Sequence, residues 1–182
     1  MNKKFLFLIV FLALTMGVKA QFYSVRTNLI GLATTNLNVE LSMALNRKWS
    51  VHLPVQYNPF VLGNERTNRQ FRNLTVQPGV RYWLVDSYAG MFVGINGVAS
   101  RFHIGNLFDK KRYDGSAFGG GVSFGNAWVI NTRWNFELEA GLGLVWADYD
   151  KYKCKKCGLK LGSFDEWRVI PTKIAVNIVY LF

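Results

Sequence analysis

The chain has little proline and cysteine, and it lacks the long apolar runs of helical membrane proteins. Only 4 of its 182 residues are Pro and only 2 are Cys. Beyond residue 20, no apolar run approaches the ~20 residues that a membrane-spanning helix needs. Few windows show helical periodicity, whereas alternation of apolar and polar residues is widespread. These features exclude a helical membrane domain and favour an all-β chain, in which 50% of the residues are hydrophobic.

Recognisable enzyme motifs are almost absent. The run Gly119–Gly121 is not a phosphate-binding loop, because neither a helix nor a Lys-Ser/Thr pair follows it. Ser100, His103 and Asp109 form the one set comparable to the Ser, His and acid of lipid A acylases or deacylases, and their spacing matches no such pattern. We therefore expect no enzymatic activity, no cofactor and no metal site. A lipid A-modifying enzyme is the least favoured alternative.

Residues 1–20 have the features of a secretory signal peptide. Lys3 and Lys4 precede an apolar run, Phe5–Leu14, and small residues flank Lys19 at the expected cleavage site. The run is too short for a membrane-spanning helix. We expect residues 21–182 to form one domain. Removing a segment with three Lys and no acidic residue would lower the net charge from +11 to +8.

The segment Trp134–Trp146 indicates what the apolar residues face. One parity of this segment is entirely apolar, whereas the other carries Asn, Glu and Gly. Trp stands at both ends of the apolar row, 12 residues apart. A strand of that length spans ~40 Å. A tilt of about 40° reduces this to ~30 Å, the height of a membrane band with its aromatic girdles.

Similar alternation predicts eight strands, an even number that suits a closed barrel. Three short connections alternate with three long ones, the asymmetry of periplasmic turns and extracellular loops. The first outer connection, around Ala33–Thr35, departs from this pattern because it is short. The phase of the fifth strand is not determined by the sequence. The fold class is therefore all-β, an eight-stranded antiparallel up-and-down transmembrane β-barrel. The expected strands are 23–32, 36–45, 48–57, 71–84, 89–102, 116–128, 133–147 and 169–182.

The polar parity of these strands would face the barrel interior. Eight strands leave a lumen that side chains can fill, so charges inside it must pair or their desolvation is costly. We favour a structural network and keep a narrow channel as the alternative. A soluble, lipocalin-like barrel would carry many Lys and Glu on its outer face, and here the polar parity is mostly Asn, Ser, Gln, Gly and Ala. The expected interior network is Arg26, Glu40, His52, Arg81, Glu137, Glu139 and Lys173.

The last strand has an apolar residue at every second position from Ile174 to Phe182. A final strand with this alternation, ending in aromatic-x-Phe, is similar to the signal that the barrel insertion machinery reads in outer-membrane proteins. The resemblance implies that Tyr180 and Phe182 form this insertion signal.

Cys154 and Cys157 are separated by two residues in the last long connection. In an exported protein, a local disulfide is the first interpretation. Zinc is a weaker one, because a closed site needs four ligands. A redox motif would open a helix beside a sheet, which nothing here supplies.

Basic and aromatic residues are interleaved in two of the long connections, around Lys110–Arg112 and Lys151–Lys156. At the cell surface these residues would meet outer-membrane lipid and the phosphates of lipopolysaccharide. Export removes nucleic acid as a partner, despite the positive net charge.

Several strings resemble a known family over nearly the whole mature chain. They are Arg26–Leu29, Leu41–Asn46, Gln56–Phe60, Gln77–Trp83, Cys154–Gly158, Pro171–Lys173 and Tyr180–Phe182. The resemblance is to an uncharacterised domain-of-unknown-function family of small outer-membrane β-barrels from Gram-negative anaerobes of the gut and mouth, often encoded beside fimbrial subunits. It implies a structural or surface-interaction role in the cell outer membrane, in which extracellular loops support assembly of fimbriae, adhesins or the envelope.

Overall fold

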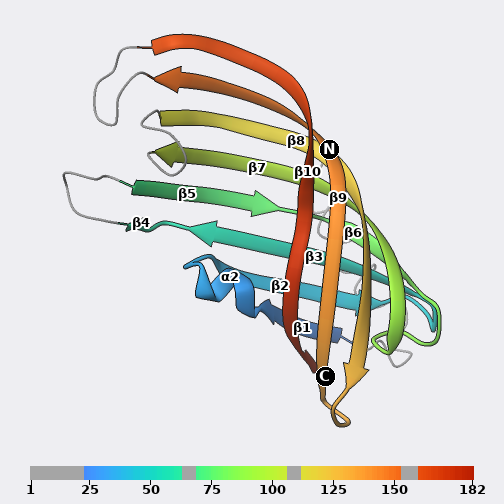
Figure 1. Cartoon of the computed structure of the whole chain (residues 1–182). Helices are drawn as coiled ribbons and strands as arrows, with labels where there is room; N and C mark the ends of the chain where they lie inside the picture. Colours follow the sequence, from blue (N-terminus) through green and yellow to red (C-terminus); the bar gives the residue numbers. More distant parts are fainter. Residues whose placement is uncertain (1–22, 63–68, 106–111, 153–159) are drawn as a thin grey trace, which may run out of the picture.

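The computed structural model describes residues 23–62, 69–105, 112–152 and 160–182, and places them in an antiparallel β-barrel (Figure 1). The residues expected to be a signal peptide lie outside these ranges. Within them, no helix is both long and apolar enough to span a membrane. The elements are β1 (Tyr23–Asn28), α2 (Leu29–Ala33), β2 (Leu37–Ala44), β3 (Trp49–Asn58), β4 (Val61–Leu62), β5 (Arg69–Val76), β6 (Gly79–Trp83), β7 (Gly90–Gly105), β8 (Arg112–Val129), β9 (Trp134–Tyr152) and β10 (Lys160–Leu181).

The barrel closes because β1 pairs with both β2 and β10. From β2, the sheet continues through β3 to β5 and β6, and then through β7, β8 and β9 to β10. The strands β5 and β6 run one after the other between β3 and β7, separated at Gln77 and Pro78, and count as one staggered strand. The eight-stranded antiparallel barrel predicted from the sequence is therefore confirmed. Strand β4 is an additional short strand beside β5.

The first expected strand, 23–32, is wrong in its second half. The strand β1 ends at Asn28, and the chain turns into α2. The side chain of Asn28 causes this change, because its oxygen accepts a hydrogen bond from the backbone N–H of Ile30 and so caps the helix. The same side chain holds the turn against β10, since it also accepts from the N–H of Val176 and donates to the carbonyl of Ile174.

The expected long connections are largely strand in the structure. Ladder pairing between β8 and β9 continues to Arg112 and Tyr152, and β10 begins at Lys160. The upper segments of β5 and β7–β10 therefore extend past the ends of β1 and β2 as a curved wall (Figure 1). The lower end carries the described chain ends and the short turns. The strands expected from the sequence are too short, because charged and tyrosine-rich segments resemble loops. Antiparallel pairing nevertheless accommodates such segments.

Glycines allow the long strands to bend at one level of the wall. A Cβ added at Gly119 would lie 2.1 Å from the carbonyl oxygen of Leu144, and one at Gly143 would lie 2.4 Å from that of Gly120. Only glycine permits so close an approach of two backbones. At the same level, the register of β10 shifts between Pro171 and Lys173, and such bulges increase local bending.

The two faces of the wall have opposite polarity, as the sequence predicted. Leu142 on β9 and Val122 on β8 are 60% and 62% exposed on the outer face. Asn135, Glu137 and Glu139 alternate with the outward residues of β9 and are buried inside. The structure also determines the phase of β7, in which Phe92 and Asn96 face inward and Ile95 faces outward.

Candidate functional site

Six interior side chains form one ion cluster across the lumen. Arg81, on β6, lies 3.0 Å from Glu40 of β2 and also contacts Glu139 of β9. Arg26, on β1, lies 2.8 Å from an oxygen of Glu137 and 3.4 Å from Glu40. The cluster therefore connects strands that are not neighbours in the sheet.

The cluster is electrically balanced. Its third cation is Lys173 of β10, whose Nζ lies 3.2 Å from Glu139 and 3.7 Å from Glu40. Three cations thus face three carboxylates, and Glu137 accepts a further hydrogen bond from Asn177. Because Arg81 is 0% exposed and Glu137 only 1%, each charge depends on its partners for the solvation that it has lost. This arrangement is typical of a structural network that holds the strands of the barrel together.

His52 lies in the same interior without joining an ion pair among the described residues. It is buried on β3, and neither ring nitrogen has a hydrogen-bond partner there. Its Nε2 is packed over Gly79, where an added Cβ would lie 2.7 Å away. All seven residues of the expected network are therefore inside the barrel, and the structure joins six of them.

Below the cluster, an apolar plug fills the lower end of the lumen. The ring centroids of Trp83 and Phe92 are 4.7 Å apart, and those of Trp83 and Tyr88 are 5.7 Å apart. Trp83 donates a hydrogen bond to Ser50, and Asn135 donates one to the carbonyl oxygen of Tyr88. The guanidinium of Arg81 lies over the Phe92 ring, 4.8 Å from its centroid. The plug and the cluster thus form one continuous packed layer.

Above the cluster, the interior opens into a cavity of about 660 Å³. Its floor includes Gln77, which donates a hydrogen bond across the lumen to the carbonyl oxygen of Thr172. The other lining residues come mainly from the inward faces of the long strands, and they combine apolar side chains with uncharged polar ones and two cations. They are Asn36, Gln56, Asn73, Thr75, Val98, Ser100, Phe102, Ile104, Tyr113, Ala117, Val145, Ala147, Tyr149, Lys151, Arg168, Ile170 and Pro171.

This cavity is not predicted by the sequence. The expected strands end at residues 102 and 147, and the last one begins at 169, which leaves Tyr149, Lys151 and Arg168 in a loop. The available signal was the alternation itself, because the inward parity of β9 continues through Val145, Ala147 and Tyr149 to Lys151.

A second cavity of about 390 Å³ lies between α2 and β10. It reaches Glu40, Glu139 and Lys173 of the ion cluster and shares Gln77 and Thr172 with the upper cavity. The two cavities therefore adjoin at the level where β1 has ended and α2 has begun.

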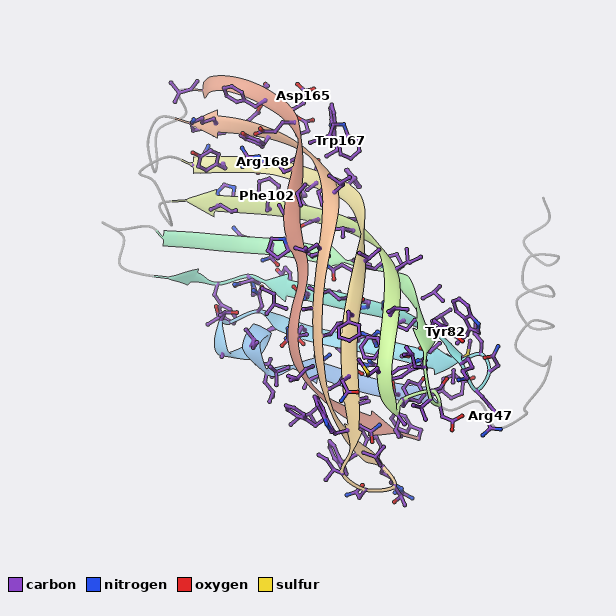
Figure 2. The ribbon with its side chains drawn as sticks, turned by 45° about the vertical axis from the view of Figure 1, so that its right-hand side comes forward. Arg47, Tyr82, Phe102, Asp165, Trp167 and Arg168 are labelled. Carbon is purple, nitrogen blue, oxygen red and sulfur yellow. The ribbon has the colours of Figure 1, made fainter. Side chains whose placement is uncertain are left out.

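The upper rim combines charged and aromatic side chains. Figure 2 shows Arg168 and Phe102 at this end of the barrel, far from Arg47 at the lower turns. Lys160 lies 2.8 Å from Asp150, and its hydrogen bond, together with one from Ser163, holds the pKa of the Asp150 carboxyl below its usual range. These contacts fix the upper ends of β9 and β10 to each other.

The structure does not assemble the enzyme-like set. Ser100 faces the upper cavity and shares a 2.7 Å hydrogen bond with Thr75. His103 stands at the opposite parity of β7 and lies 3.1 Å from Asp114. Asp109 lies outside the described residues. Because Ser100 and His103 face opposite sides of the sheet, they cannot act on one substrate.

The remaining sequence-predicted residues are divided between described and undescribed segments. The rings of Tyr180 and Phe182 pack edge to face at the lower end with centroids 5.0 Å apart, and the N–H of Phe182 donates to the carbonyl oxygen of Tyr23. Cys154 and Cys157 lie outside the described residues. Among the described ones, no three His, Cys, Asp or Glu side chains are grouped as a metal site.

In a comparison with known protein families, residues 6–182 match the model of a family described as "Protein of unknown function (DUF3575)". No curated protein and no solved structure matches the chain.

Proposed function

Because the chain belongs to the family of proteins of unknown function DUF3575, we propose a role for it from its architecture: it is a small outer-membrane barrel of structural or surface-interaction type. The observation that carries this proposal is the inverted polarity of the barrel. Arg26, Arg81 and Glu137 are buried inside, while Ile95 and Leu142 are 71% and 60% exposed outside. Exposure of such an outer face to water would destabilise the barrel, whereas contact with lipid would stabilise it.

Aromatic side chains at two heights of the outer face support the membrane location. The lower group includes Trp49 with Tyr82, and Trp134 with Tyr180, each pair having ring centroids 5.0 Å apart. The upper group includes Trp146 and Trp167, 5.3 Å apart. Trp and Tyr favour the two interfaces of a membrane. The height between the groups along β9 is that of a tilted membrane-spanning strand.

If the barrel spans the membrane between these two aromatic groups, the upper rim is the surface that meets other molecules. Its cations would face the phosphates of lipopolysaccharide, and Tyr180 and Phe182 at the other end would be the strand signal for the insertion machinery. The sequence resemblance supports fimbrial or adhesin proteins as the partners.

We expect the protein to appear in the outer-membrane fraction of cells separated by density. It should also migrate faster on a gel when unheated than when boiled, because a closed barrel resists detergent. An outer-membrane porin and a periplasmic enzyme serve as the two reference markers. Recovery with the periplasmic marker would refute the membrane location.

The plug argues against the channel alternative and allows a second test. Trp83, Tyr88 and Phe92 close the lower end, and the ion cluster fills the lumen above them. We expect the purified protein in planar bilayers to give no stepwise conductance at voltages at which a porin conducts. Reproducible unitary steps from the barrel would restore the channel.

A further inference from the structure

We propose that the upper cavity binds a long-chain amphiphile with an anionic head group. The acyl chain would lie against the inward wall of β7–β10, and the head group would reach the cations at the rim. This inference goes beyond the proposed function, because binding at this site can be measured whether or not the protein resides in the outer membrane.

The chemistry of the inward side chains changes along one strand. On β9, the inward positions run from Glu137 and Glu139 through two glycines to Val145 and Ala147. The inward positions are therefore charged below the bend, whereas above it they include apolar side chains and line the larger of the two cavities described. A cavity of about 660 Å³ is within the range of ligand sites, roughly 300–1,000 Å³. A barrel that needed only stability would fill this space with side chains.

The charged side chains that line the cavity are cations. Lys151 and Arg168 are its two charged residues, and no carboxylate is among the described residues that line it. Arg168 shares its charge with Glu166. Lys151 lies over the rings of Tyr113 and Phe164, at 5.7 and 5.8 Å from their centroids, and makes no ion pair among the described residues. The lining thus offers a cation to an anionic head group.

One edge of the wall lacks a paired strand. The strand β10 pairs with β1 only from Asn177 to Leu181, and the side chain of Asn28 binds its backbone at Val176 and Ile174. Above Ile174, the described ladders pair β10 with β9 alone. This free edge contains Pro171 and a register shift, features that prevent another strand from pairing with it. This unpaired edge therefore favours contact with a flexible chain over an added β-strand.

The test is photolabelling of the purified protein in discs of zwitterionic phosphatidylcholine. The probe is palmitate with a diazirine near the end of its chain, and mass spectrometry locates the labelled residues. Because the probe also dissolves in the bilayer, it will label outward residues, which provide an internal reference. We expect additional labels at inward residues of β7–β10, such as Val98 and Phe102.

Two variants and their matched controls determine the outcome. Ala147→Trp fills the cavity and should lower inward labelling at least about tenfold, whereas Leu144→Trp on the outer face of the same strand should not. Lys151→Gln should lower it about tenfold, as expected for a lost charge-assisted hydrogen bond, whereas Lys160→Gln should not. If Ala147→Trp loses heat-modifiable mobility, Ala147→Leu replaces it. Inward labelling that is absent from the unaltered protein, or that neither cavity variant lowers, would overturn the proposal.

Two further probes distinguish the head group and its source. The diazirine analogue with an alcohol in place of the carboxylate should label the cavity weakly, and equal labelling would refute the requirement for an anion. Phosphatidylglycerol with the same photoreactive chain tests a membrane lipid. Inward labelling by phosphatidylglycerol identifies the source as the bilayer, whereas labelling by palmitate alone identifies a free amphiphile.

Discussion

Replacing Arg81 with Met is expected to lower the free energy of unfolding by about 3–5 kcal/mol, the cost of removing one partner from a buried ion pair. The guanidinium is 0% exposed and lies between Glu40 and Glu139. Without it, three buried carboxylates would face two cations. Urea unfolding of the barrel in lipid vesicles, followed by Trp fluorescence, measures the loss.

A double variant separates charge balance from packing. Arg81→Met combined with Glu139→Met leaves two cations and two carboxylates, with Lys173 still 3.7 Å from Glu40. We expect it to recover most of the lost stability. The control is Arg47→Met, because Arg47 is paired with Asp86 at the surface with its side chain 88% exposed, and such pairs contribute at most about 1 kcal/mol. If Arg81→Met and Arg47→Met lower the free energy of unfolding equally, the ion cluster does not stabilise the barrel.

Replacing Leu142 with Arg is expected to lower the stability of the inserted barrel by about 2–4 kcal/mol, the cost of Arg on the lipid face near the midplane. Leu142 stands on the outer face of β9, between the girdle residues Trp134 and Trp146. The amount of folded protein recovered in the membrane fraction should fall accordingly. Unfolding from lipid vesicles gives the size of the effect.

The same substitution distinguishes a membrane barrel from a soluble one. In water, a residue that is 60% exposed would tolerate Arg with a change within about 0.5 kcal/mol. Leu142→Met is the matched control, since it keeps an apolar side chain of similar size in contact with lipid. If Leu142→Arg and Leu142→Met unfold at the same urea concentration, the outer face does not contact lipid.

Local alternation was sufficient to predict the barrel and its two faces. Along β9, every second residue from Trp134 to Trp146 is apolar, and this period places those side chains on one side of the sheet whatever the partner strand is. The same alternation predicts that Arg26, Glu40, Arg81 and Lys173 lie in the lumen, because each stands at an inward-facing position of its strand.

Tertiary structure alone decided which of these charges meet, and where the lumen is full or empty. The pairing of Arg81 with Glu139 depends on the register of strands that are distant in the sequence, and no local pattern encodes it. The end of β1 depends on one hydrogen bond, from the N–H of Ile30 to the side chain of Asn28. The upper cavity exists because the long strands bend at glycines whose backbones approach each other, and because β10 extends beyond the end of β1. Sequence by itself determined the polarity of each face, since that is a property of single residues. The shape of the space between the faces was set by register and closure, which are properties of the whole barrel.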